Sequence, residues 1–484
     1  MPTRESMRSR LEAWAGFWRD EVWGHDWRAL RLVVGLACLV TTTYIGYVYA
    51  QDIMVDGWQL WAWAICLSLT VLALMPAGRP RIHWDWTWIG LAILLLASLS
   101  TRITALEHVP GGLHVDEMGV ADFAMRQVFP EPHLTIYPFR PGPASQPALY
   151  HYLVRLSLLI VGNSITGLRA SSALAGALAV LATYALVATL QDRWTAAFSA
   201  LLMGAYHYHV HWSRIGLNNI WDTLWVPLML FTYAWGWKRR WSGGAVLCGL
   251  VVGLSQYFYT GSKVGVFVLA YLIYWLWRQD PDRRRLVVHA GKAILTAAVV
   301  AAPTVLSAIR DPVPYFDRAR IVFGWQADAI AVFSGGRFGF PVYVDYFWTQ
   351  IWRSFGAYIA VPDVTGFYGP GVPFLIGLAA PLFIVGIFWA LRNRQPIAPL
   401  WILLITFFGG FMLTGAPSSS HFITSIPAIC WLTAIPLGWL AQQGRWRLAV
   451  LGAFLIMVTD LLFYFAIYVP SAPRDLIHAF PPGP

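Results

Sequence analysis

Residues 168–190 read LRASSALAGALAVLATYALVATL, a stretch of apolar and small residues whose only charge is Arg169 near its start. A helix needs about 20 mostly apolar residues to cross the hydrocarbon core of a membrane. The stretch is therefore long enough to cross a membrane as one helix. Because charge is costly inside a bilayer, we expect Arg169 to lie at the end of that helix, near one membrane surface.

Similar apolar runs recur along the chain and set its fold class. The sequence is 58% hydrophobic and only 12% charged, whereas a soluble domain has about 25% charged residues. This composition excludes soluble, disordered, fibrous and disulfide-stapled proteins. It predicts an all-α polytopic membrane protein with about 13 transmembrane helices. The thirteen candidate spans are 30–50, 58–77, 84–102, 168–190, 194–211, 219–237, 243–258, 263–277, 288–308, 372–391, 397–414, 422–440 and 446–469.

The basic residues orient these spans. The net charge of +10 does not indicate a nucleic-acid partner, because most arginines form short clusters between apolar runs, as the positive-inside rule requires. The apolar stretch 147–162 is short and contains His151 and Arg155. If it crossed the membrane, the clusters 238–240 and 283–285 would both lie outside. We therefore interpret it as a juxtamembrane helix on the outer face. The N-terminus of the chain is then cytoplasmic. We expect the protein in the cell (plasma or inner) membrane.

This interpretation divides the chain into seven segments, of which the two long outer loops are rich in Pro, Gly and aromatic residues. Long surface segments of this kind often carry function. The segments are a cytoplasmic interfacial helix (1–29), three spans (30–102), a first outer loop with juxtamembrane helices (103–167), six spans (168–308), a second outer loop (309–371), four spans (372–469) and an outer tail (470–484).

Two adjacent carboxylates, Asp116 and Glu117, follow a Gly-Gly pair in the first outer loop. Apolar residues continue after them at helical spacing, so we expect the pair at the start of a short interfacial helix. One interpretation is a helix cap, because the helix dipole favours negative charge at an N-terminus. The other is a general base that takes a proton from an acceptor.

Three cations are expected at the same membrane level as this carboxylate pair. Arg169 begins one span, Arg214 follows another, and Lys263 begins a third. Each is a candidate to stabilise an anionic leaving group. Each is equally a candidate for a charge that anchors a helix end at the membrane surface.

The stretch Tyr206–Trp212 is rich in histidine and aromatic residues. His207 and His211 lie one helical turn apart, a spacing that suits a shared metal or a phosphate contact. No carboxylate or cysteine at ligand spacing completes a metal site. The alternative is an aromatic belt with hydrogen-bonded imidazole rings.

Three stretches together resemble the GT-C class of membrane glycosyltransferases, and in particular the family-39-like group. That group includes the protein O-mannosyltransferases and the lipid A aminoarabinose transferases. The similarity is carried by His114–Gly119, by Gln146–Leu153 followed by Gly167–Gly176, and by Trp212–Asn219. Their order and spacing carry the resemblance, since no one of these motifs is specific by itself.

The resemblance implies a GT-C fold and a polyprenyl-phosphate-linked sugar donor handled on the outer face of the membrane. Asp116 matches the catalytic base of the family, and Arg169 and Arg214 match basic positions near the donor phosphate. His211 and Tyr259 are further candidates for the donor site.

Three positions depart from the charges found in relatives. Gln146 stands where some relatives have Lys, Asn219 where some have Asp, and His421 where relatives often have Arg. We keep all three as candidate donor-binding residues. Their loss of charge leaves phosphate binding to depend more on Lys263 and Arg214.

The sequence thus predicts a glycosyltransferase that uses a single inverting displacement. Asp116 removes the proton of an acceptor hydroxyl on a protein, lipid or glycan, and Glu117 orients Asp116 or the acceptor. Arginines supply the positive charge, so we expect no metal or other cofactor. The alternative is a lipid-linked sugar transporter or a non-catalytic membrane subunit, in which Asp222 and Asp460 would be the intramembrane ionisable residues.

Overall fold

The computed structural model describes residues 26–471, apart from 77, 79–84, 129–133, 143–147 and 364, together with Glu12. The interfacial helix expected within 1–29 and the outer tail 470–484 lie almost entirely outside the described residues. Gln146 also lies outside them.

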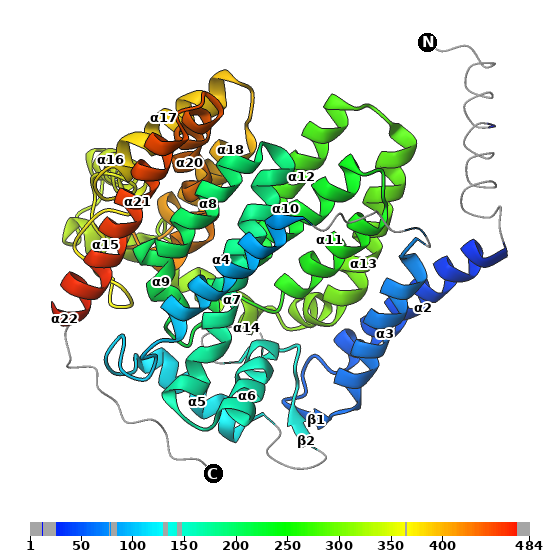
Figure 1. Cartoon of the computed structure of the whole chain (residues 1–484). Coiled ribbons are helices and arrows are strands. Elements are labelled where there is room, and N and C mark those ends of the chain that lie inside the picture. The colour runs from blue at the N-terminus through cyan, green and yellow to red at the C-terminus, as the bar shows by residue number, and fades with distance from the viewer. Residues whose placement is uncertain are drawn as a thin grey trace.

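Each of the thirteen predicted spans contains a helix in the described part of the chain (Figure 1). Within the described residues, six helices are long and apolar enough to cross a membrane, and others are shorter apolar helices. The α-helical polytopic class is therefore confirmed, while the number of crossings stays a prediction. The helices are α2 (Asp26–Val48), α3 (Trp58–Leu74), α4 (Trp86–Ile103), α7 (Ile165–Leu190), α8 (Arg193–Ala205), α10 (Asp222–Lys238), α11 (Gly243–Ser255), α12 (Gly261–Gln279), α13 (Arg283–Arg310), α17 (Ala379–Arg392), α18 (Ile397–Thr406), α20 (Ile426–Gln442) and α21 (Trp446–Leu462).

Shorter elements connect these helices and cap one end of the bundle. The first outer loop contains α5 (Val115–Arg126) and α6 (Leu149–Val161), and the second contains α14 (Val313–Val322), α15 (Ala327–Ser334) and α16 (Phe340–Gly356). The remaining short pieces are α9 (His207–Ser213), η3 (Asn218–Trp221), η4 (Phe407–Phe411), α19 (Ser419–Phe422), η5 (Ile423–Ser425), η6 (Phe463–Tyr468) and α22 (Val469–Ser471).

A two-stranded antiparallel sheet departs from the all-α expectation. Strand β1 (Met54–Asp56) pairs with β2 (Leu134–Ile136), with Met54 opposite Ile136. The sheet lies with α5 and α6 at one end of the bundle, at the bottom of Figure 1. It ties the connection after α2 to the first outer loop. Helix α6 has 13 residues, as do α8 and α11, so its length alone does not separate it from the predicted spans, and its place outside the membrane stays a prediction.

Polar contacts gather several basic segments at the other end of the bundle. Lys238 donates from Nζ to the Thr189 carbonyl (2.6 Å), and Lys292 donates to the Leu74 carbonyl (2.8 Å). The ends of α3, α7 and α10 therefore lie at one end of the bundle together with Lys292 of α13, as the positive-inside orientation requires. Which end faces the cytoplasm stays a prediction.

Glycines allow the turn after α9 to pack directly on α7. A Cβ atom at Gly176 would lie 2.1 Å from Ser213 Oγ, and one at Gly216 would lie 2.6 Å from Leu168 Cγ. Both distances are far below a van der Waals contact. Small residues let membrane helices approach closely, and here they hold the 213–217 turn against the start of α7.

Cysteine labelling tests the predicted orientation. The four native cysteines are buried, so a cysteine-free background can be built and single cysteines introduced as Gly119→Cys, Lys263→Cys and Arg239→Cys. A membrane-impermeant maleimide applied to intact cells should label positions 119 and 263, which are exposed at the α5 end. Position 239 should react only after permeabilisation; labelling there in intact cells would contradict the orientation.

Candidate functional site

The Asp116–Glu117 pair lies in the first turn of α5, as the sequence predicts. His114 precedes the helix and accepts a hydrogen bond at Nδ1 from the Asp116 backbone N–H (3.1 Å). Glu117 Oε2 accepts one in return from the His114 backbone N–H (3.2 Å). This reciprocal arrangement is a capping box, which satisfies N–H groups that a helix start leaves free.

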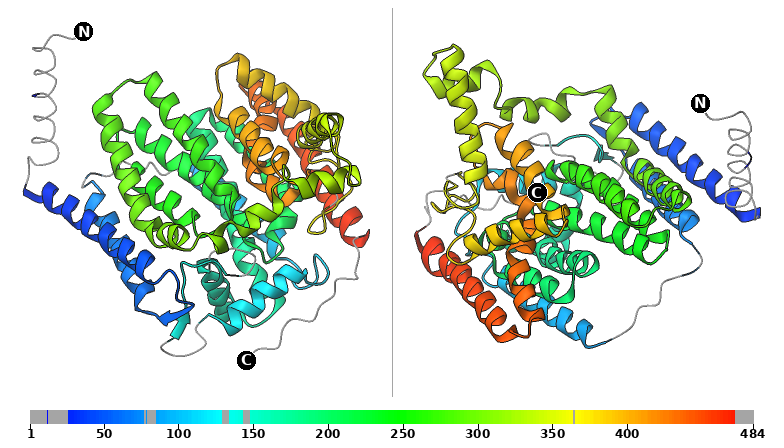
Figure 2. Two further views of the ribbon diagram at one scale, coloured as in Figure 1. Left: turned by 180° about the vertical axis from the view of Figure 1, so that it is seen from behind. Right: turned by 90° about the horizontal axis from the view of Figure 1, so that it is seen from above.

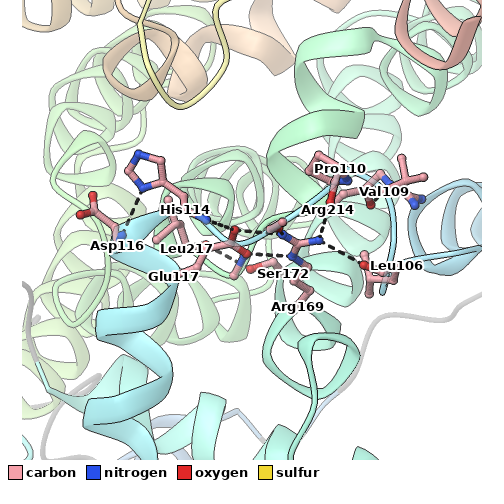
Figure 3. A network of polar contacts seen from close by, with 12 residues as sticks. Leu106, Val109, Pro110, His114, Asp116, Glu117, Arg169, Ser172, Arg214 and Leu217 are labelled. Atoms are coloured by element: carbon pink, nitrogen blue, oxygen red, sulfur yellow. Dashed lines mark hydrogen bonds and ion pairs between the residues drawn. The ribbon is translucent and has the colours of Figure 1, made fainter. Parts of the chain in front are cut away.

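Glu117 forms a bidentate ion pair with Arg169 on α7, and both side chains are buried (Figure 3). Arg169 Nε donates to Oε1 at 2.8 Å and Nη2 donates to Oε2 at 3.0 Å. The Gly216 backbone N–H also donates to Oε1, at 2.7 Å. Both oxygens of Glu117 are thus occupied by groups of the protein.

Every N–H group of Arg169 has a protein acceptor. Besides Glu117, the guanidinium donates to the carbonyls of Leu106 (3.2 Å), Pro110 (3.0 Å) and Gly112 (2.6 Å). A guanidinium has five N–H donors, so none is left for a phosphate in this arrangement. Gly112 has a positive φ of 75°, which glycine adopts without strain. The sequence suggested that Arg169 contacts phosphate and that Glu117 orients a reactant, whereas the structure places both in a network that fixes the start of α5.

Arg214 is also buried and bonded to the protein. It donates from Nε to the Val109 carbonyl (3.0 Å), from Nη1 to Thr101 (2.6 Å) and from Nη2 to Thr104 (2.6 Å). Carbonyls at the end of a helix lack intrahelical partners, and Arg214 satisfies those at the end of α4. Burial lowers the pKa of Arg214 from its ordinary value. The side chain thereby anchors the turn after α9 to α4.

Asp116 differs from all of these residues, because its side chain is exposed. Among the described residues no hydrogen bond or ion pair is recorded for its carboxylate. Figure 3 shows the carboxylate turned away from the Glu117–Arg169 pair. The His114 ring beside it packs on Phe367, with ring centroids 4.5 Å apart. Both long outer loops therefore meet next to a free carboxylate.

A second cluster joins three of the residues expected to bind the donor. Tyr259 Oη lies 3.0 Å from His421 Nδ1, and Asn219 Nδ2 donates to the Ser420 carbonyl at 3.3 Å. Asn219 is on η3, just after the turn whose Gly216 bonds to Glu117. The same short segment thus links the carboxylate pair to the Tyr259–His421 cluster.

Lys263 lies in the first turn of α12, four residues after Tyr259, and it is exposed. The buried Asp222 is close enough to interact with it electrostatically. Asp222 Oδ2 accepts a hydrogen bond from Thr424 Oγ1 at 3.2 Å. Of the three cations expected from the sequence, Lys263 is the exposed one.

The histidines of α9 are buried among aromatic side chains. His207 Nδ1 lies 2.7 Å from Tyr368 Oη, and His211 Nε2 lies 2.9 Å from the Phe367 carbonyl. The His211 ring stacks on Tyr368 at 4.1 Å, and its Nδ1 lies 3.4 Å from Tyr464 Oη. The structure therefore favours hydrogen-bonded imidazoles over a phosphate contact at His211. Within the described residues, no group of three His, Cys, Asp or Glu is placed to hold a metal.

Sequence reasoning missed the part of the second outer loop that reaches the site. Phe367 and Tyr368 cover the α9 histidines, and the buried Asp363 accepts hydrogen bonds from the backbone N–H groups of Ser419 and Thr365, each at 3.0 Å. Burial raises the pKa of Asp363, although these hydrogen bonds oppose the shift. No local pattern in 309–371 marks these residues, because their partners lie far away in the sequence.

The buried Arg102, at the end of α4, was also missed. Its Nη2 lies 2.7 Å from His209 Nδ1, and its Nε donates to Ser213 Oγ at 3.2 Å. His209 Nε2 in turn lies 3.1 Å from Thr223 Oγ1. The sequence signal for Arg102 is that it is a single arginine at the end of an apolar run. Its partners on α9, and their neighbour on α10, lie far away in the sequence, so the run itself does not predict them.

Comparison with known proteins agrees with this fold. The family model described as dolichyl-phosphate-mannose-protein mannosyltransferase matches residues 145–307, which include Arg169, Arg214 and Lys263 but not Asp116. No curated protein matches the sequence.

Several solved membrane transferases are similar in structure. ArnT from Cupriavidus metallidurans bound to undecaprenyl phosphate is 17% identical, with a TM-score of 0.51, covering 77% of this chain and 64% of its own. The oligosaccharyltransferase AglB from Archaeoglobus fulgidus is 16% identical (TM-score 0.48; 79% and 55% covered), and the arabinosyltransferase EmbB from Mycobacterium smegmatis is 16% identical (TM-score 0.39; 86% and 45% covered). The chain thus spans about half the length of the oligosaccharyltransferase.

The family model and the ArnT structure confirm the resemblance expected from the sequence. The chain has the fold of the GT-C membrane glycosyltransferases.

Removing one partner of the Glu117–Arg169 pair should strongly destabilise the fold. Glu117→Gln leaves a buried guanidinium without its counter-charge, which costs about 3–5 kcal/mol when one partner of a buried pair is removed. On the same helix, Asp122 and Arg126 form an exposed pair, and exposed pairs contribute about 0–1 kcal/mol. In denaturant unfolding measured in detergent, the midpoint of Glu117→Gln should therefore be clearly lower than the midpoint of the control Asp122→Asn. Equal midpoints for the two variants would show that the buried pair does not hold the site together.

Proposed function

We propose that the protein is an inverting glycosyltransferase that moves a sugar from a polyprenyl phosphate to an acceptor hydroxyl on the outer face of the membrane. The observation that carries the proposal is the contrast between the two adjacent carboxylates. Glu117 is buried and fully bonded, while Asp116 is exposed and held in place by the same helix turn. A fixed helix start with one free carboxylate suits a general base.

In the proposed reaction, Asp116 takes the proton of the acceptor hydroxyl. The acceptor oxygen forms a bond to the anomeric carbon from the face opposite the phosphate. The bond from that carbon to the phosphate oxygen breaks, and its electron pair leaves with the polyprenyl phosphate. One displacement of this kind inverts the anomeric configuration. A positioned base typically contributes about 10²–10⁴-fold to the rate.

The leaving phosphate gains negative charge as the bond breaks, so a cation at that point stabilises the transition state. The N–H groups of Arg169 are all used within the protein, and Arg214 is bonded to three carbonyls. Lys263, the exposed residue among the three cations, is therefore the leading candidate for the phosphate contact, four residues after Tyr259, which contacts His421.

Support for a polyprenyl phosphate donor comes from the similar ArnT, whose structure holds undecaprenyl phosphate. The acceptor hydroxyl belongs to a protein, a lipid or a glycan. The transporter alternative rests on ionisable residues inside the membrane. Asp222 bonds to Thr424, and Asp460 lies 3.7 Å from His207, so each of these buried carboxylates has a partner within the bundle.

Asp116→Asn should lower turnover by about 10²–10⁴-fold, because an amide is nearly isosteric but cannot take the proton. Release of polyprenyl phosphate from a sugar-linked donor by the purified protein gives the rate. Donor affinity and unfolding midpoint should stay close to those of the wild type. The control Asp122→Asn, on the exposed part of the same helix, should leave the rate unchanged. Near-normal turnover in Asp116→Asn would refute the assignment of the base.

Lys263→Ala should weaken binding of polyprenyl phosphate by about 1.5–3 kcal/mol, the usual contribution of a hydrogen bond to a charged group. Lys263→Arg should restore only part of this, since a planar fork and a compact ammonium differ in geometry. Lipid affinity measured in detergent tests both variants, with Arg239→Ala at the opposite end of the bundle as the control. If Lys263→Ala bound polyprenyl phosphate with unchanged affinity, the role of Lys263 would be to anchor a helix end at the membrane surface.

A further inference from the structure

Helix α14 of the second outer loop is tied at both ends to other parts of the chain. Near its start, Tyr315 Oη donates to the Phe139 carbonyl of the first outer loop (2.7 Å). At its end, the Thr414 backbone N–H donates to the Val322 carbonyl (2.9 Å). Figure 2 shows the chain leaving α13 and running through α14 to α15 and α16. Helix α14 therefore joins the first outer loop to the segment that precedes α19 and His421.

The face of α14 that turns toward the bundle carries Arg318. Tyr315 and Val322, both partly buried, lie three residues before and four residues after Arg318. Residues at these two spacings share one face of a helix. Arg320 is exposed and lies two residues after Arg318, which places it on the opposite side of a helix with 3.6 residues per turn. The same helix thus offers one arginine toward the bundle and one away from it.

Arg318 lies close to the Tyr259–His421 cluster. It interacts electrostatically with both residues, whose Oη and Nδ1 atoms lie 3.0 Å apart. The buried Asp222 interacts electrostatically with Tyr259 and with Lys263. Two exposed cations, Lys263 of α12 and Arg318 of α14, therefore adjoin the same group of polar side chains.

The Arg318 guanidinium is available to a ligand. The residue is exposed, and no hydrogen bond or ion pair joins its side chain to another residue in the described part of the chain. Arg169 and Arg214, in contrast, donate to several protein groups. A guanidinium presents five N–H donors in a planar fork, a geometry that matches phosphate oxygens.

We propose that Arg318 binds the phosphate of the donor and, together with Lys263, stabilises it as the leaving group. The inference rests on the proposed transferase function and adds a residue of the second outer loop to its donor site. A sugar-linked polyprenyl phosphate is a phosphodiester with a single negative charge. When its bond to the anomeric carbon breaks, the electron pair stays on the phosphate oxygen. The monoester released carries a charge of about −1.5 to −2 at pH 7, so a second cation favours the transition state over the bound donor.

Lipids that differ only in head-group charge test this proposal. The probes are undecaprenyl phosphate and its methyl diester, which have the same chain. The variants are Arg318→Gln and Arg318→Lys, with Arg320→Gln on the same helix as the matched control. Both positions are exposed, so these substitutions leave the core intact. Affinity is measured in nanodiscs at about pH 8, where the monoester is a dianion.

The wild type should bind undecaprenyl phosphate more tightly than the methyl diester. Arg318→Gln should weaken binding of undecaprenyl phosphate by about tenfold or more, the usual effect of losing a hydrogen bond to a charged group, and should weaken binding of the diester less. Arg318→Lys should recover part of the loss, since an ammonium keeps the charge without the planar fork. Arg320→Gln should bind both lipids as the wild type does. Unchanged affinity in Arg318→Gln, the same loss in Arg320→Gln, or equal losses for the two lipids would overturn the proposal.

Turnover separates a failure of this inference from a failure of the proposed function. If the wild type releases polyprenyl phosphate from a sugar-linked donor but Arg318→Gln keeps wild-type affinity and turnover, Arg318 lies outside the donor site and the transferase proposal stands. If the wild type binds neither lipid and releases no polyprenyl phosphate, the proposed function itself fails.

Discussion

The buried ion pair between Glu117 and Arg169 is the interaction on which the rest of the site depends. Two charges placed in a low-dielectric interior are stabilising only when their hydrogen-bonding groups are satisfied. Here both carboxylate oxygens and all five guanidinium N–H groups have partners within the protein. The pair joins α5, α7, the 106–112 segment and the turn at Gly216. The pair therefore positions Asp116, which precedes Glu117 on α5. It also positions η3, which follows the turn at Gly216.

The cations of the outer end divide into two kinds. Arg169 and Arg214 donate to several carbonyls at once, a task that suits a planar group with five fixed donors. Lys263 is exposed on a flexible stem, which suits a mobile charge that meets a phosphate. In the sequence, Arg169, Arg214 and Lys263 all look like basic residues near the same membrane level. In the structure they have different roles. Of the five candidates Asp116, Glu117, Arg169, Arg214 and Lys263, the exposed residues are one carboxylate and one ammonium.

Local pattern predicted the elements but not their long-range partners. Each predicted apolar run contains a helix in the described part of the chain, and the Asp-Glu pair after Gly-Gly located the start of α5. The pairing of Arg169 with Glu117 was not predictable, because 52 residues separate them. The sequence marked the second outer loop as a long segment of possible function but did not predict α16, which buries Tyr346 and Gln350 and exposes Trp348 and Trp352. The contacts of Phe367 with His114 and of Tyr368 with His207 also depend on the folded chain.

The most direct measurement for the central claim follows the fate of a sugar-linked polyprenyl phosphate in proteoliposomes that contain the purified protein. Mass spectrometry of lipid and acceptor fractions distinguishes cleavage from movement across the bilayer. With a set of sugar donors and with protein, lipid and glycan acceptors, the account predicts polyprenyl phosphate and glycosylated acceptor in equal amounts, with inverted anomeric configuration. An intact donor that only changes leaflet, or a product that retains the donor configuration, would contradict it.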